Sequence, residues 1–148
     1  VTAPVSLGAG MFLTGPVPRY TAFEDVGGAF CRDPEGAVAD PIADDQALYI
    51  DTPRGIVVVL GCAHAGVINT VNYVRALTGG KPLHMVVGGM HLANASRERV
   101  AATVAALGHA RIDRLLPAHC TGPDATAALR AAFPGACEWV MTGMQIRV

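Results

Sequence analysis

The stretch GIVVVLGCAHAG, residues 55–66, runs from an apolar β-branched segment into a glycine turn that carries His64. The same order recurs twice, in MVVGGMH ending at His91 and in IDRLLPAH ending at His119. A helix signal follows each histidine: either apolar residues at helical spacing or a residue that favours a helix start. The sequence therefore predicts three strand–turn–helix units, with helices over 66–77, from Ser96 to about 107, and over 123–133.

The rest of the chain predicts two further parts. Residues 47–50 and 55–60 have strand character and flank a hairpin turn, and 138–141 and 145–148 would close the sheet. Residues 1–45 hold five prolines and little periodicity, so we expect an irregular segment with one short strand around 11–14. The prediction is an α/β domain over 46–148, one mixed sheet with helices on one face, and a 1–45 segment that lines or covers a site or serves as a solvated connector.

Composition excludes several classes of protein. With 51% hydrophobic residues the chain can bury a core, and a net charge of −1 argues against nucleic acid as a partner. No apolar run is long enough to cross a membrane. Four cysteines without a Cys-x-x-Cys pair are typical of reduced thiols, which predicts a cytoplasmic protein.

The three strand-end histidines are the candidate metal ligands. Side chains just past the carboxyl ends of neighbouring strands converge on one crevice, and three neutral imidazoles there suit a zinc-like ion. His64, His91 and His119 are equally open to a structural role. His84 and His109 are expected at the surface. A structural zinc site that uses Cys62 and Cys120 is a further alternative, although adjacent residues in extended chain point to opposite faces, and buried inert thiols are the simpler role.

Five short motifs carry a family resemblance. The segments 60–67 (LGCAHAGV), 87–92 (VGGMHL) and 118–122 (AHCTG) resemble motifs of the dihydropterin-type subgroup of the metallo-β-lactamase superfamily. Upstream, 13–19 (LTGPVPR) and 44–48 (DDQAL) look like further motifs of that subgroup. The resemblance covers nearly the whole chain.

The resemblance implies half of an αββα sandwich with a metal crevice at one edge. His64 would match the third-motif histidine and His119 the final histidine, while His91 stands near the usual bridging aspartate. The leading His-x-His-x-Asp-His motif is absent from these residues. We therefore expect a C-terminal half whose bare sheet face meets a missing N-terminal half, a partner chain or a second copy.

The implied activity is metal-dependent hydrolysis of an ester or phosphoester in a small-molecule substrate. The cofactor would be a divalent metal, zinc in the first place, with manganese or iron as alternatives. Arg19 and Tyr20 are the candidate substrate-binding residues. The alternative is a non-catalytic half-domain or assembly module with idle histidines.

Overall fold

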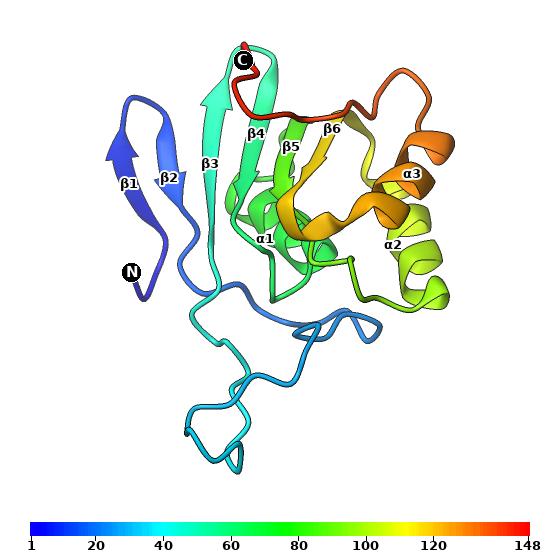
Figure 1. Ribbon diagram of the computed structural model, residues 1–148. Helices are drawn as coiled ribbons and strands as arrows, with labels where there is room; N and C mark the ends of the chain where they lie inside the picture. Colours follow the sequence, from blue (N-terminus) through cyan, green and yellow to red (C-terminus); the bar gives the residue numbers. More distant parts are fainter.

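A computed structural model describes all residues from Val1 to Val148, and its centre is one six-stranded sheet with strands in chain order (Figure 1). The strands are β1 (Val5–Gly8), β2 (Met11–Leu13), β3 (Ala47–Thr52), β4 (Gly55–Leu60), β5 (Leu83–Gly89) and β6 (Ile112–Ala118). Strands β1 to β4 pair antiparallel, whereas β4, β5 and β6 pair parallel. The mixed sheet follows from the connections, because the predicted hairpin turn separates β3 from β4 and a helix separates each parallel pair.

Each parallel strand is followed by a helix: α1 (Val67–Leu77), α2 (Arg97–Ala110) and α3 (Pro123–Ala132). Ser96 caps α2, since its hydroxyl accepts a hydrogen bond from the backbone N–H of Arg99 at 3.2 Å. Helix α2 ends at Ala110, three residues beyond the predicted end at 107. Gly108 is tolerated within the last turn because the buried Leu107 anchors that turn, and the left-handed Arg111 follows as the C-cap.

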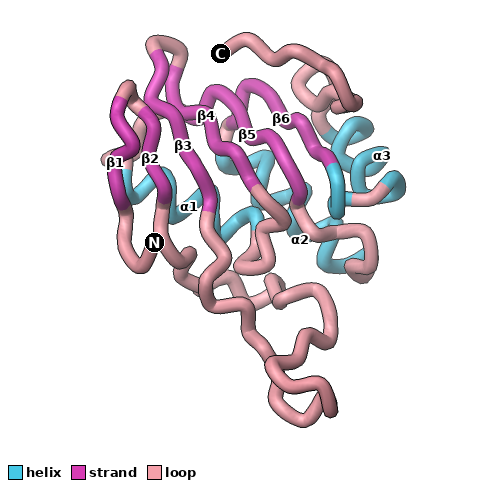
Figure 2. Tube along the Cα trace, turned by 60° about the vertical axis from the view of Figure 1, so that its left-hand side comes forward, coloured by secondary structure: helices cyan, strands magenta, loops and turns pink.

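The helices cover one face of the sheet, as Figure 2 shows. Apolar residues of that face pack with the inner sides of the helices in one buried cluster, which includes Val58, Val86 and Leu115 from the sheet and Val71 and Leu129 from the helices. One mixed sheet with helices on one face confirms the predicted fold class.

The opposite face of the sheet is partly covered by the C-terminal segment. Val57, Met85 and Leu116 are buried there, and Val140 and Ile146 pack against them. The strands predicted over 138–141 and 145–148 are wrong: beyond β6 the backbone forms only one isolated bridge, between Leu115 and Cys137. After Cys137 the chain crosses the sheet instead of extending its edge, and so it lies over a face expected to be bare (Figure 1).

Residues 1–45 join the sheet and then pack along α1. Strand β2 lies where the short strand was predicted, and β1 pairs with it outside the prediction. The side-chain oxygen of Asn69 in α1 accepts hydrogen bonds from the backbone N–H groups of Tyr20 and Thr21, each at 2.9 Å. The division at residue 45 stays a prediction. No helix has the length and apolar character that a membrane crossing requires.

Candidate metal centre

The three predicted strand-end histidines follow the carboxyl ends of the parallel strands, along one end of the sheet. Strands β4, β5 and β6 are parallel and in register, with Val59 beside Val87 and Gly89 beside Ala118, so their carboxyl ends line up. His64 follows β4, His91 follows β5 and His119 follows β6. This edge is where the predicted crevice should lie.

His64 and His91 form a close pair at this edge. Their ring centroids are 4.1 Å apart, and the ring of Phe30 contacts both, at 5.0 Å from His64 and 6.1 Å from His91. Phe30 belongs to the 1–45 segment, whose role as a lining or cover of the site stays a prediction.

Backbone carbonyls fix the orientation of both rings. Nδ1 of His64 lies 3.0 Å from the carbonyl oxygen of Val26, and Nε2 of His91 lies 3.3 Å from that of Gly27. A carbonyl only accepts, so each of these nitrogens carries the proton and the other nitrogen of each neutral ring keeps its lone pair. A Cβ at Gly27 would lie 2.1 Å from Cδ2 of His91, and glycine is therefore required for this approach.

His91 has the protonation properties of a metal ligand. Burial lowers the pKa of its imidazole, and the nearby His64 lowers the pKa further. Its Nδ1 is buried and has no hydrogen-bond partner. A neutral ring with an unpartnered lone pair fits a metal ion, because coordination would satisfy the nitrogen that the fold leaves without a partner.

His119 takes a different place from this pair. It is exposed and begins a short 3-10 turn, His119–Thr121, with a positive φ of 50°. Ala63 and His91 also have positive φ, of 54° and 47°, so each parallel strand ends near a left-handed residue that is not glycine. The three histidines do not form a set with all ligand atoms close together, and ligation by His119 stays a prediction.

The one set of three possible ligands that the structure brings together contains both strand-end thiols. Cys62, His91 and Cys120 each place a ligand atom within 4.8 Å of the other two. All four cysteines are free, and the predicted cytoplasmic location stays a prediction. Burial raises the pKa of the Cys120 thiol to about 11. Cys120 joins this cluster and His119 does not; both lie in the 3-10 turn His119–Thr121, where the alternation of an extended chain does not apply.

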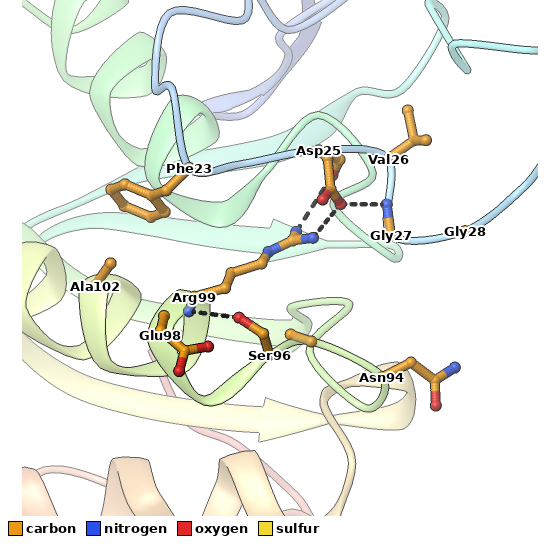
Figure 3. A pocket seen from close by; sticks show the side chains of 11 residues that line it. Phe23, Asp25, Val26, Gly27, Gly28, Asn94, Ser96, Glu98, Arg99 and Ala102 are labelled. Carbon is orange, nitrogen blue, oxygen red and sulfur yellow. Dashed lines mark hydrogen bonds and ion pairs between the residues drawn. The ribbon is translucent and has the colours of Figure 1, made fainter.

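A pocket of about 940 Å³ lies next to the histidine pair, and Figure 3 shows the residues that line it. Gly27 and Gly28 belong to its wall, and Gly27 also touches His91. The guanidinium of Arg99, a residue that is only 7% exposed, pairs with the carboxylate of Asp25 and donates to the Asp25 carbonyl oxygen at 3.2 Å. Sequence reasoning missed Arg99, because nothing local marks one arginine of a helical first turn as buried.

The two predicted substrate residues lie outside this pocket wall. Arg19 donates to the carbonyl oxygens of Pro41 and Ile42, at 2.7 and 3.1 Å, and so holds the loop that precedes β3. Tyr20 is 89% exposed. A role in substrate binding stays a prediction for both.

The two remaining histidines were expected at the surface, and one is not. His109 is exposed in the last turn of α2. His84 lies inside β5 and is only 7% exposed, with Nδ1 at 3.1 Å from a carboxylate oxygen of Asp113 and Nε2 without a partner. The surface prediction for His84 is wrong because β5 begins two residues earlier than the apolar run suggested.

Known proteins resemble this chain over part of their length. No family model matches the chain. A curated relative, the 7,8-dihydropterin-6-methyl-4-(β-D-ribofuranosyl)-aminobenzene-5′-phosphate synthase of Methanocaldococcus jannaschii, is 31% identical over 110 residues, which are 74% of this chain and 37% of that protein. An uncharacterised protein of the same organism is 29% identical over 129 residues, 87% of this chain and 47% of its own length.

A solved structure extends the likeness to the fold. The crystal structure of a metal-dependent hydrolase of the β-lactamase superfamily matches with a TM-score of 0.81 and 28% identity, over 100% of this chain and 57% of that one. The chain thus spans less than half of the curated relatives and little more than half of the solved structure.

The sheet, the strand-end histidines and these likenesses together define the class: the chain belongs to the metallo-β-lactamase superfamily. Within the superfamily, it is similar to the dihydropterin synthase of M. jannaschii.

Proposed function

We propose that the chain supplies part of the metal site of a metal-dependent hydrolase that acts on an ester or phosphoester in a small molecule. The observation that carries the proposal is the His64–His91 pair, whose rings lie 4.1 Å apart with the Nδ1 of His91 buried and without a partner. The likeness to a metal-dependent hydrolase supports it. The curated relative is named a synthase, so hydrolysis of an ester or phosphoester is itself part of the proposal.

The chain's own residues would hold a divalent metal, zinc in the first place and manganese or iron as alternatives. His64 would offer Nε2, because its Nδ1 proton points to Val26, and His91 would offer Nδ1. His119 would complete the set from the end of β6. When bound, such an ion lowers the pKa of water near to neutrality and polarises an oxygen of the substrate.

The neighbouring pocket would hold the substrate. Its wall is shared with the metal centre through Gly27, and Arg99 places a buried cation in it. Asp25 neutralises that cation, and its carboxylate is largely exposed to solvent. An anionic group of a substrate would therefore bind by displacing the Asp25 carboxylate and forming the ion pair with Arg99 in its place. Arg19 and Tyr20 would contact the substrate only from the loop outside this wall.

Residues outside this chain would complete the site. The chain matches only 57% of the related hydrolase, and Leu48, Ile50, Val59 and Val87 are only partly buried on the sheet face that the helices do not cover. An N-terminal half, a partner chain or a second copy packed there would bury them and bring further ligands to the edge. The 1–45 segment would then remain as a wall of the crevice.

Metal content tests the proposal. The purified chain, alone and with whatever completes it, is loaded with zinc, dialysed, and assayed by elemental analysis together with intact mass. His64→Ala should lose the metal held at the histidine pair, and the control His109→Ala, at an exposed position of α2, should keep it.

Two results would refute the proposal. Unchanged metal content in His64→Ala, measured with Cys120 also replaced by serine so that the thiols cannot hold the ion, would exclude the histidine pair as the site. Metal binding by the completed protein without hydrolysis of any ester or phosphoester in a substrate panel would favour the non-catalytic alternative, in which the histidines are idle.

A further inference from the structure

Two thiols that the proposed hydrolytic function does not use meet the imidazole of His91 at the carboxyl ends of the parallel strands. Cys62 follows β4, His91 follows β5 and Cys120 follows β6, and one ligand atom of each lies within 4.8 Å of the others. Sulfur and imidazole nitrogen are the ligands that soft divalent ions, zinc above all, prefer in proteins.

The loops that carry the three residues are bonded to one another. The carbonyl oxygen of Cys120 accepts hydrogen bonds from the backbone N–H groups of Leu92 and Ala93, both at 3.1 Å. The N–H of Gly89 donates to the carbonyl oxygen of Gly61 at 3.0 Å. The backbone next to each candidate ligand is therefore fixed before any ion arrives, which reduces the entropy lost on binding.

Two features point to a ligand at this cluster. The buried Nδ1 of His91 has no partner within the fold. Gly89 leaves the space that the thiols occupy, because a Cβ there would lie 2.7 Å from Sγ of Cys120 and 3.3 Å from Cα of Cys62. A buried nitrogen without a partner costs free energy, and a bound ion would remove that cost.

We propose that Cys62, His91 and Cys120 form a metal site for a soft divalent ion, distinct from the imidazole site of the proposed hydrolase. On binding, each thiol releases one proton to solvent, both thiolates and Nδ1 of His91 coordinate the ion, and no bond to carbon changes. Three protein ligands leave a fourth position for water or for an exogenous ligand. His91 belongs to both sites, so the two sites compete for its ring.

Cadmium and cobalt(II) are the probes, added to the reduced, chelator-treated chain of 148 residues. Thiolate ligation should give charge-transfer absorption in the near ultraviolet that saturates at one ion per chain. Cys62→Ser and Cys120→Ser should each abolish this absorption, whereas Cys31→Ser, at an exposed cysteine outside the cluster, should leave it unchanged. Circular dichroism of each variant reports whether it has folded.

The wild-type chain supplies a second test that needs no variant. Bound cadmium should protect Cys62 and Cys120 from alkylation, mapped by mass spectrometry, and should leave the exposed Cys31 reactive. Equal alkylation of all three with and without cadmium would overturn the proposal. So would charge-transfer absorption that survives Cys120→Ser, or a disulfide between Cys62 and Cys120 forming in place of metal binding.

His64→Ala separates this site from the hydrolytic one. The variant should keep the charge-transfer absorption while it loses the metal held by the histidine pair. If absorption and hydrolysis disappear together in His64→Ala but persist in Cys120→Ser, the thiol site is refuted and the proposed function stands. If absorption disappears in Cys120→Ser but both absorption and hydrolysis persist in His64→Ala, the proposed function is refuted and the thiol site stands.

Discussion

Glu24 caps α1 from far away in the sequence, and its removal should weaken both the fold and the metal centre. The position before the helix is Gly66, which has no side chain to cap it. Glu24 takes this role: its two carboxylate oxygens accept hydrogen bonds from the backbone N–H groups of Ile68 and Asn69, both at 2.8 Å. A Cβ at Gly66 would lie 2.1 Å from Oε2 of Glu24, so the glycine leaves room for the remote cap.

The magnitude follows from these two bonds. Glu24→Ala leaves two N–H groups of the first turn without their acceptor, at about 1 kcal/mol each once water partly replaces it. Burial raises the pKa of Glu24 by more than the two backbone hydrogen bonds lower it. The expected loss of stability therefore includes no additional contribution from the charge of Glu24. The expected loss is about 2 kcal/mol, or roughly 6 °C in Tm for a chain of this length.

The same change should reach the histidines, because Glu24 anchors the segment whose Val26 and Gly27 carbonyls orient His64 and His91. The assays are thermal unfolding followed by circular dichroism and zinc retention after dialysis. Glu98→Ala is the matched control, an exposed acidic residue in the first turn of α2, and it should change Tm far less. Equal Tm shifts for the two variants, or unchanged zinc retention in Glu24→Ala, would refute the reasoning.

Three further outcomes are expected. Gly27→Ala should displace the His91 ring and lower zinc retention, whereas Gly135→Ala, with a similar φ of 81° and no neighbour within 4 Å, should not; equal retention would count against the contact. His84→Leu should change the free energy of unfolding in urea by less than about 1 kcal/mol, because removal of the buried Nε2 that has no partner offsets the loss of the contact with the exposed Asp113; a loss of about 3 kcal/mol would contradict this. The raised pKa of Glu24 means that the native state binds this proton more tightly than the unfolded state. The stability advantage of wild type over Glu24→Gln should therefore shrink as pH rises from 4.5 through the folded pKa, and an advantage that grows over that range would reverse the sign.

Local periodicity was enough to predict the three strand–helix units and the edge where their histidines lie. Each of β4, β5 and β6 contains a short apolar run, and a glycine or proline stands at or just after the carboxyl end of the strand; these signals are local. The C-terminal segment shows the limit of such signals. Val140 and Ile146 stand in apolar runs that suit an edge strand equally well, but they pack across the sheet face, and periodicity does not distinguish the two.

Side-chain partners far apart in the chain could not be predicted. Glu24 meets α1 across 44 positions, and Asp25 meets Arg99 across 74. Alternation along an extended chain predicted that His119 and Cys120 would separate, but not which of them would turn toward His91. Both residues lie in the 3-10 turn His119–Thr121, which begins at the left-handed His119 and which the pattern of the preceding strand does not predict.

The left-handed residues at the three strand ends set stability against function. Ala63, His91 and His119 each adopt a conformation that costs a residue other than glycine about 1 kcal/mol or more. Replacement by glycine would relax the backbone at any of them, but at His91 and His119 it would also remove a candidate ligand. At Ala63 alone, glycine would relieve the backbone strain without removing a candidate ligand. Selection for thermostability alone would therefore be expected to replace Ala63 first, and replacement at the other two positions would remove ligands from the metal centre.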